Sequence, residues 1–148
     1  DEASWFGIRM GRVLKSMHKR KAMGGYPAGL VYGGESTVII EGKPGIGGRN
    51  MELALALAVE AGSDPPFDYA ALCFGTDGSD GSSPAAGAFV DSTTLQRAHV
   101  LGLDPQHALD IHDTHPFFET LGDLYAPGPT GTNVADLAVV IVGPAKEV

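Results

Sequence analysis

Helix-like and strand-like patterns of apolar residues alternate along the chain. Residues from about Ser4 to Met23 predict a helix with a ragged apolar face. The Leu- and Ala-rich segment RNMELALALAVEAG predicts the strongest helix, which ends at Gly62 as a C-cap. Two shorter helices are predicted over STTLQRAHVLG and PFFETLG, residues 92–102 and 116–122.

Short apolar runs between these helices predict strands. The runs are LVYGG, STVIIEG, AALCFG and LAVVIVG, residues 30–34, 36–42, 70–75 and 137–143. AAGAFVD, residues 85–91, is ambiguous, with a short strand favoured. Helices interleaved with buried strands indicate an α/β fold. Because two strands adjoin around Gly33 and Gly34, we expect a mixed β-sheet with helices packed on it rather than a purely parallel sheet.

The length and the breaks in the pattern indicate the domain organisation. With 148 residues, the chain is long enough for one domain with a substantial core. The segment GGYPAG breaks the chain after the first helix. We therefore expect residues 1–24 to form a leading basic helix and linker, and residues 25–148 to form the α/β domain.

Charge is distributed unevenly over the chain, whose formal net charge is −8. Six basic side chains lie within residues 1–23: Arg9, Arg12, Lys15, Lys19, Arg20 and Lys21. The acidic remainder argues against a nucleic-acid-binding protein. A solvated helix face explains the basic segment best, and a helix that docks on a partner or a membrane surface is the alternative.

Two features concern the compartment. The longest apolar stretch near the end, LAVVIV, is far too short to span a bilayer, and acids occupy the N-terminus where a signal peptide has basic residues. The single cysteine, Cys73, lies in an apolar run and has no partner for an internal disulfide. We expect a protein of the cytoplasm or another reducing compartment, without a membrane partner.

The polar residues with catalytic or binding potential lie in loops at predicted strand ends, where open α/β sheets bind ligands. Four loops contribute them: GGES with Glu35; GKPGIGGRNME with Gly47, Gly48, Arg49 and Asn50; GTDGSDG with Thr76, Asp77 and Asp80; and GPTGTNVAD with Thr132 and Asn133.

Each loop has a functional and a purely structural interpretation. The glycine loop before Arg49 exposes N–H groups that bind anions, and the arginine would add a bidentate contact to a phosphate or carboxylate, but paired glycines also simply end elements. Asp77 and Asp80 could share a magnesium ion through water, although their segment fails the EF-hand pattern. Alternatively, they are loop-tip carboxylates that bond nearby N–H groups in an Asx turn and contribute little to the core.

The remaining candidates are weaker. GPTGTN could be an ordinary reverse turn between two strands. His112 and His115 flank Asp113, so a metal site there is conceivable, but a capped helix start at Asp113 or Thr114 explains this segment better.

Together, the segments GGESTV, GIGGRNMELALA, GTDGSDG, AAGAFVD, HPFFETLGDL and GPTGTNVADL occur in an order that resembles one known family. They are similar to the C-terminal, or MOFRL, domain of the glycerate kinases that form 2-phosphoglycerate. The resemblance runs from about Gly33 to Val142, and Met51 stands where the family usually has Gln. Some members are also labelled hydroxypyruvate reductases, but the chain has no dinucleotide fingerprint.

The resemblance implies one domain of a two-domain α/β kinase, with ATP, magnesium and D-glycerate meeting in the cleft between the domains. It implies catalytic roles for Arg49, Asp77 and Asp80, with the two aspartates also as magnesium ligands. Substrate or phosphate binding is implied for Glu35, Gly47, Gly48, Asn50, Thr76, Thr132 and Asn133. The family's N-terminal domain, which supplies a lysine to the site, would be the partner and lies outside this chain.

We therefore expect the C-terminal domain of a glycerate kinase, which contributes to ATP-dependent phosphorylation of D-glycerate and is inactive alone. The alternative is a non-catalytic anion- or nucleotide-binding domain, or an interaction domain, that has lost its catalytic partner.

Overall fold

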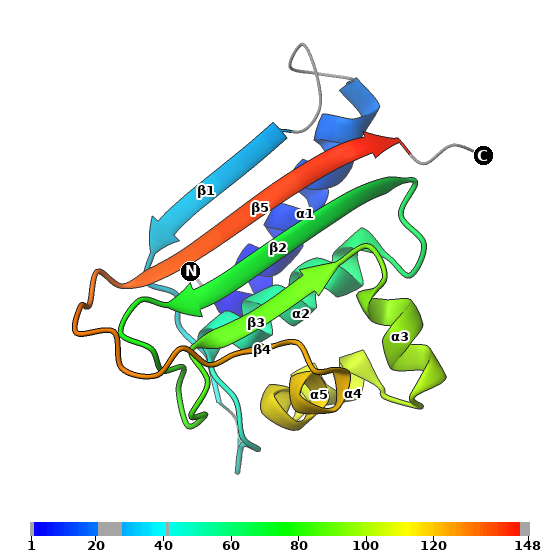
Figure 1. The fold of residues 1–148 in the computed structure, drawn as a ribbon. Coiled ribbons are helices and arrows are strands. Elements are labelled where there is room, and N and C mark those ends of the chain that lie inside the picture. Colours follow the sequence, from blue (N-terminus) through cyan, green and yellow to red (C-terminus); the bar gives the residue numbers. More distant parts are fainter. Residues whose placement is uncertain (1, 21–27, 41, 146–148) are drawn as a thin grey trace.

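The computed structural model describes residues 2–20, 28–40 and 42–145 (Figure 1). The helices are α1 (Ala3–Arg20), α2 (Arg49–Ala61), α3 (Thr94–Val100), α4 (Pro105–Asp110) and α5 (Thr114–Leu121). The strands are β1 (Ala28–Gly34), β2 (Phe67–Gly75), β3 (Gly87–Asp91), β4 (Leu124–Tyr125) and β5 (Asp136–Ala145).

The strands form one five-stranded sheet in the order β1-β5-β2-β3-β4. The predicted α/β fold, with helices packed on a sheet, is confirmed. Every pair of neighbouring strands is antiparallel, so the pairing is not mixed. The last strand, β5, inserts between β1 and β2, which is a long-range arrangement that local patterns do not encode.

The predicted strand over residues 36–42 is wrong. Among its described residues, only Thr37 makes a strand-like contact, an isolated bridge to Glu2, and residues 38–40 form a loop. Its apolar side chains include Ile39 and Ile40, both more than half exposed. Strand propensity is realised only beside a partner strand, and none of the five described strands pairs with residues 36–40.

The long helices follow the sequence pattern closely. α2 ends at Gly62, as predicted, where the positive φ of 98° suits glycine. α1 is confirmed as far as Arg20, whereas its predicted end at Met23 and the break that follows fall in residues 21–27, outside the described part of the chain. The six-residue helix α4 was not predicted, although Asp104 caps it by accepting from the His107 N–H, with Pro105 at its start.

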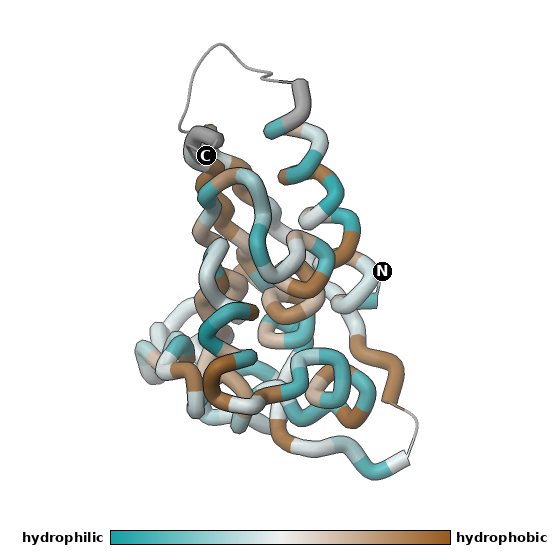
Figure 2. Tube along the Cα trace, turned by 90° about the vertical axis from the view of Figure 1, so that its right-hand side faces the viewer, coloured by the Kyte–Doolittle hydropathy of each residue, from teal (hydrophilic) through white to brown (hydrophobic). Residues whose placement is uncertain are grey.

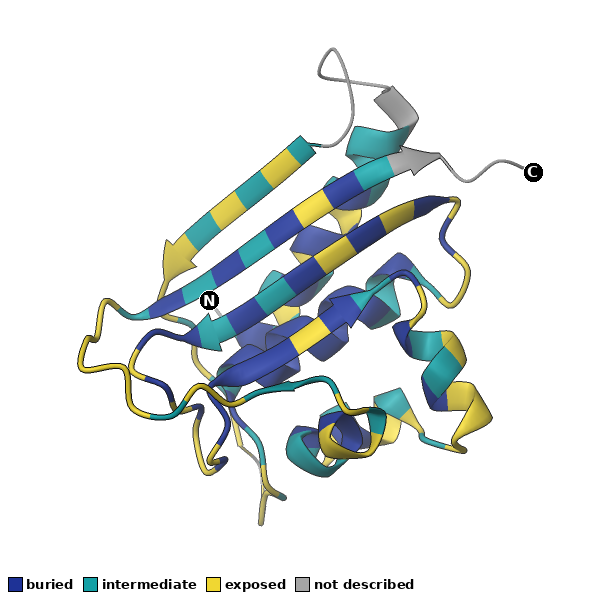
Figure 3. Cartoon of the chain, in the orientation of Figure 1, coloured by how far each residue is buried: buried dark blue, intermediate teal, exposed yellow. Residues whose placement is uncertain are grey.

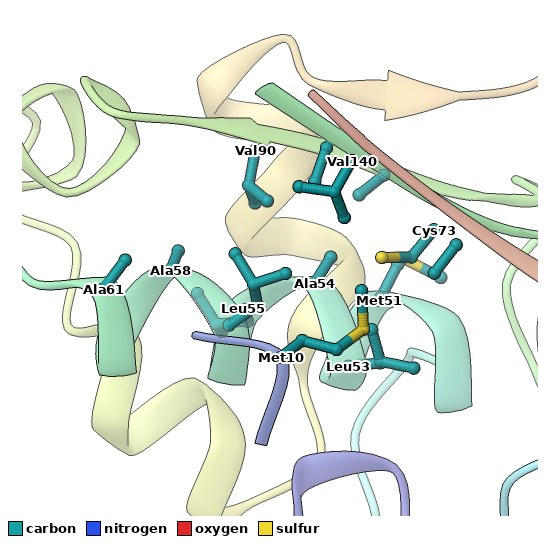
Figure 4. Close-up of a cluster of buried hydrophobic side chains, with 14 of the residues drawn as sticks. Met10, Met51, Leu53, Ala54, Leu55, Ala58, Ala61, Cys73, Val90 and Val140 are labelled. Atoms are coloured by element: carbon teal, nitrogen blue, oxygen red, sulfur yellow. The ribbon is translucent and has the colours of Figure 1, made fainter. Parts of the chain in front are cut away.

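The main core lies between the sheet and α2, and α1 packs beside α2. Figure 1 shows α1 and α2 behind the sheet, and the side view in Figure 2 shows α1 on one side of the apolar strands. In Figure 4, Leu55 and Ala58 of α2 point toward Val90 and Val140 of the sheet. All four side chains are buried, so α2 is the central element of the core.

Helix α1 contributes to the same core and crosses α2 at close range. Met10 and Leu14 are buried among the core residues. A Cβ atom at Gly7 would lie 2.3 Å from the Leu53 carbonyl oxygen of α2, so the two backbones approach too closely for any side chain at this position. The predicted division of the chain near residue 24 stays a prediction, and the first helix packs directly on the domain.

Two further findings concern membrane-spanning helices and the single cysteine. Within residues 2–20, 28–40 and 42–145, no helix has the length and apolarity that crossing a membrane requires. Cys73 is a fully buried free thiol, and burial raises its pKa.

Candidate functional site

A cleft of about 500 Å³ opens at the N-terminal end of α2, where three of the four predicted loops meet. Five predicted site residues line it: Gly47, Gly48, Arg49, Asp77 and Asp80. The other side chains come mainly from the segment after β1, the loop after β2, Glu52 and His112. Glu35, Asn50, Thr76, Thr132 and Asn133 are not among its lining residues.

Arg49 is the first residue of α2, and its side chain is fixed by two carboxylates, from the segment after β1 and from the start of β5. Its Nε lies 2.7 Å from Oδ2 of Asp136, and its Nη2 donates to Oδ1 of the same carboxylate over 3.1 Å. Its Nη1 donates to Oε1 of Glu35 over 3.2 Å. The hydrogen bond to Asp136 raises the pKa of Arg49 despite partial burial. The guanidinium is therefore charged and held in one orientation at the edge of the cleft.

Asp80 is buried and caps α2 from the loop after β2. Its Oδ1 accepts the backbone N–H of Asn50 over 3.1 Å, and its Oδ2 accepts that of Met51 over 2.9 Å. Gly48, at the N-cap position, has no side chain to make these bonds. The alternative of a loop-tip carboxylate does not describe Asp80, because the residue is 2% exposed and its N–H partners lie on α2 rather than in its own loop. Burial raises its pKa to about 6, against the opposing effect of these hydrogen bonds.

The glycines before α2 allow its N-terminal loop to pack closely on its neighbours. A Cβ atom at Gly48 would lie 2.3 Å from Cγ of Asp80, and one at Gly47 would lie 2.4 Å from Oγ1 of Thr114. The N–H groups of Asn50 and Met51 already bond the Asp80 carboxylate. The protein's own carboxylate thus occupies the position that the sequence suggested for a bound anion.

Asn50 links Asp80, which lines the cleft, to Asp136, which does not. Its side-chain amide donates to Oδ1 of Asp80 and to Oδ1 of Asp136, both over 3.1 Å. The residue is 1% exposed, so in this structure it positions other groups rather than presenting its amide to the cleft.

Asp77 is exposed and lies on the wall of the cleft. Its Oδ1 accepts the backbone N–H and the hydroxyl of Ser79, over 3.0 and 3.2 Å, which is the Asx turn that the sequence offered as an alternative. Mg²⁺ commonly uses one or two carboxylates, with substrate phosphates and waters as its other ligands. Asp77 fits that mode. Asp80 fits it less well, because both its oxygens accept N–H groups of α2.

The remaining predicted residues organise the loop between β4 and β5. The Thr76 hydroxyl donates to the Ala135 carbonyl over 2.7 Å and accepts the Val134 N–H over 2.8 Å, so it ties this loop to the end of β2. Asn133 Oδ1 accepts the N–H of Ala135 over 3.1 Å. Asn133 and Thr132 are exposed on the loop, and their predicted contact with ligand oxygens stays a prediction.

Sequence reasoning missed a pair that lines the cleft, formed by buried Glu52 and partly buried His112. Glu52 is 3% exposed, and its Oε1 lies 2.7 Å from Nδ1 of His112. Burial raises the pKa of Glu52, although His112 opposes the shift. Sixty positions separate the two residues, so no local pattern signals the pair. His115 instead bonds the Ser83 hydroxyl over 2.8 Å, and the described residues contain no group of three or more His, Cys, Asp or Glu suited to a metal ion.

Comparison with known proteins identifies the family. A model of the MOFRL family matches residues 28–136, most of the described chain. The chain belongs to the MOFRL family. This confirms the resemblance that the six sequence segments indicated.

Similar proteins are longer than this MOFRL chain. It is 39% identical over 141 residues to a glycerate 2-kinase of Pyrococcus horikoshii, covering 95% of the chain and 31% of that protein. It is 42% identical over 117 residues to a D-glycerate 2-kinase of Thermotoga maritima, covering 78% of the chain and 27% of that protein. The crystal structure of a glycerate kinase from Thermotoga maritima superimposes with a TM-score of 0.87 at 35% identity, over 95% of this chain and 33% of that one. The chain thus spans about a third of these relatives.

Proposed function

We propose that this chain is the C-terminal domain of a glycerate kinase and contributes to the ATP-dependent phosphorylation of D-glycerate to 2-phosphoglycerate. The observation that carries the proposal is the oriented guanidinium of Arg49 at the edge of the cleft. A planar, charged fork suits the carboxylate of glycerate or the phosphoryl group in transfer. The glycerate kinases among the relatives of the chain support the same activity.

Phosphoryl transfer depends on positioning and charge neutralisation more than on covalent chemistry by the protein. Arg49 would bind the anionic substrate, while Asp136 and Glu35 keep its guanidinium oriented. Asp77, the exposed carboxylate on the wall, would orient or deprotonate the glycerate hydroxyl, or bind magnesium beside the phosphates. Magnesium, when bound, would neutralise negative charge on the phosphates of ATP.

The charge of the cleft indicates that this domain supplies only part of the site. Arg49 is the single arginine or lysine among the cleft-lining residues of the described chain, and Glu52, Asp77 and Asp80 line the same space. ATP and glycerate together are strongly anionic, so binding them here requires further positive charge. A lysine from the N-terminal domain, which the family resemblance implies, together with magnesium would provide it.

The test is an assay of the full-length polypeptide that carries this chain. We expect ADP release that requires both D-glycerate and magnesium, with 2-phosphoglycerate as the product identified by ³¹P NMR. ADP release that does not depend on glycerate, or a product phosphorylated at another hydroxyl, would contradict the proposal. Binding of nucleotide without turnover would instead favour the non-catalytic alternative.

A further inference from the structure

The face of the sheet that points away from α1 and α2 is apolar and uncovered by any described helix (Figures 1 and 3). We call it the outer face and define it by Val31 of β1, Leu72 and Phe74 of β2, Phe89 of β3, and Val139 and Ile141 of β5. Val31 is 70%, Ile141 52% and Phe89 45% exposed, and the other three are partly exposed. Figure 3 shows buried residues alternating with more exposed ones along β2 and β5.

The outer-face residues adjoin across the strands rather than lying scattered. Val31 pairs with Val139, Val139 with Leu72, and Leu72 with Phe89, which makes one unbroken apolar row across β1, β5, β2 and β3. In a neighbouring row, Ile141 lies opposite Ala70 of β2. Contiguous exposed apolar surface of this kind marks a site of association in soluble proteins, whereas single exposed apolar residues do not.

An aromatic cluster lies at one side of the outer face. Tyr125 of β4 makes edge-to-face contacts with Phe74 and Phe89, with ring centroids 5.3 and 5.7 Å apart. Buried aromatic residues commonly supply much of the energy of an interface. These three rings would therefore be the main anchor of whatever covers the face.

Two carboxylates at one end of this face, Asp68 near the start of β2 and Asp91 at the end of β3, already have partners in the chain. Asp68 accepts the Ser92 hydroxyl over 3.0 Å, and Asp91 accepts the N–H and hydroxyl of Thr93, both over 2.7 Å. Permanent interfaces resemble a domain core and carry little charge, whereas interfaces that form and separate are more polar. The composition of the outer face therefore points to a permanent neighbour.

We propose that helices from the remainder of the same polypeptide cover the outer face and complete a three-layer arrangement of helix, sheet and helix. This inference rests on the proposed function, in which the chain is one domain of a longer kinase. The chain spans only 31% of its Pyrococcus relative, so the rest of such a polypeptide has ample residues to form this layer. An antiparallel sheet can leave one face to water, but that face is then polar, whereas the outer face of this antiparallel sheet is apolar and needs a cover.

Cysteine labelling tests the proposal, because the native Cys73 is fully buried and would stay unreactive. Val31→Cys and Ile141→Cys each place a thiol on the outer face, and Val100→Cys on α3, at an 84% exposed position, is the matched control. Each variant is reacted with a maleimide in the 148-residue chain and in the full-length polypeptide. We expect the outer-face thiols to react at least tenfold more slowly in the full-length polypeptide and the control to change by less than twofold.

Two results would overturn the proposal. One is equal labelling of Val31→Cys and Ile141→Cys in both proteins. The other is protection within the 148-residue chain that rises with its concentration, since this would identify a second copy as the occupant. The kinase assay separates this inference from the proposed function. An active full-length enzyme whose outer-face thiols react freely contradicts only this inference. A protected outer face in a polypeptide without kinase activity contradicts only the proposed function.

Discussion

At the scale of single residues, Arg49 shows how the chain fixes a charged group before any ligand binds. In the proposed full-length kinase, we expect Arg49→Lys to lower kcat/KM for glycerate at least tenfold. The guanidinium makes a bidentate contact with Asp136 and also bonds Glu35. The ammonium group of lysine is a point charge and cannot make all of these contacts at once. Steady-state kinetics with varied glycerate would measure the loss.

Arg97 offers a matched control for this substitution. Its Nη1 and Nη2 donate to the two oxygens of Asp123 over 3.1 and 2.7 Å, and the residue is not among those that line the cleft. Arg97→Lys therefore breaks the same kind of bidentate pair and should leave kcat/KM within about twofold of the parent enzyme. Equal losses in the two variants would remove Arg49 from the substrate site.

Asp80 makes the stability of the chain depend on pH. Its folded pKa of about 6 exceeds the ordinary 3.8, so between these pH values the folded state binds more protons than the unfolded state. Its contribution to stability is therefore greatest below pH 4 and is lost as the pH rises through 6. Between pH 4 and 7, the parent chain should lose about 2 kcal/mol more unfolding free energy than Asp80→Asn, which cannot titrate. Urea unfolding at both pH values measures this, and parallel pH curves would contradict it.

At the scale of elements, α2 depends on a cap from a distant loop. We expect Asp80→Ala to destabilise the chain by about 2 kcal/mol, because two backbone N–H groups and the Asn50 amide lose their acceptor. Asp77→Ala, three positions earlier in the same loop, removes only an exposed Asx turn and should cost less than about 0.5 kcal/mol. Urea unfolding of both variants would decide, and similar losses would show that the loop as a whole, rather than the cap, matters.

The close crossing of α1 and α2 depends on Gly7, which has no side chain. Gly7→Ala places a Cβ atom 2.3 Å from the Leu53 carbonyl oxygen and 2.9 Å from Cβ of Ala56. Separating the helices should destabilise the chain by at least about 1 kcal/mol, although alanine favours helix more than glycine does. Ser16→Ala on the same helix should change the thermal midpoint little. A Gly7→Ala variant as stable as the parent would show that the helices separate without loss.

The elements that the sequence predicted correctly are those whose signal is local. α2 and β5 have long apolar patterns, and each pattern fits one kind of element, a helix for α2 and a strand for β5. Residues 36–40 have the composition of a strand but lack a neighbouring strand, which the composition does not reveal. The same limit applies to the site. Gly47, Gly48 and Arg49 were found from a local motif, whereas the capping role of Asp80 and the Glu52–His112 pair join residues 30 or more positions apart.

At the scale of the whole molecule, we expect the isolated 148-residue chain to fold but not to phosphorylate glycerate. The residues between α2 and the sheet already form one buried core within this chain. The cleft, however, contributes a single Arg or Lys among the described residues that line it. Circular dichroism should show a cooperative thermal transition, and a coupled assay for ADP should show no glycerate-dependent release. Turnover near about 1 per second would mean that the chain holds a complete site of its own.

The position of β5 has a consequence for synthesis. This strand comes last in the sheet-forming part of the chain, yet it lies between β1 and β2 and bonds to both. While a ribosome is making the polypeptide, β1 has no strand beside it until residues 136–145 emerge. Through most of its translation, the nascent domain therefore keeps an open sheet edge. Chaperones bind such incompletely folded chains, and aggregation begins at their unpaired strands. Its final cooperative step must follow the last strand, whatever has folded before it.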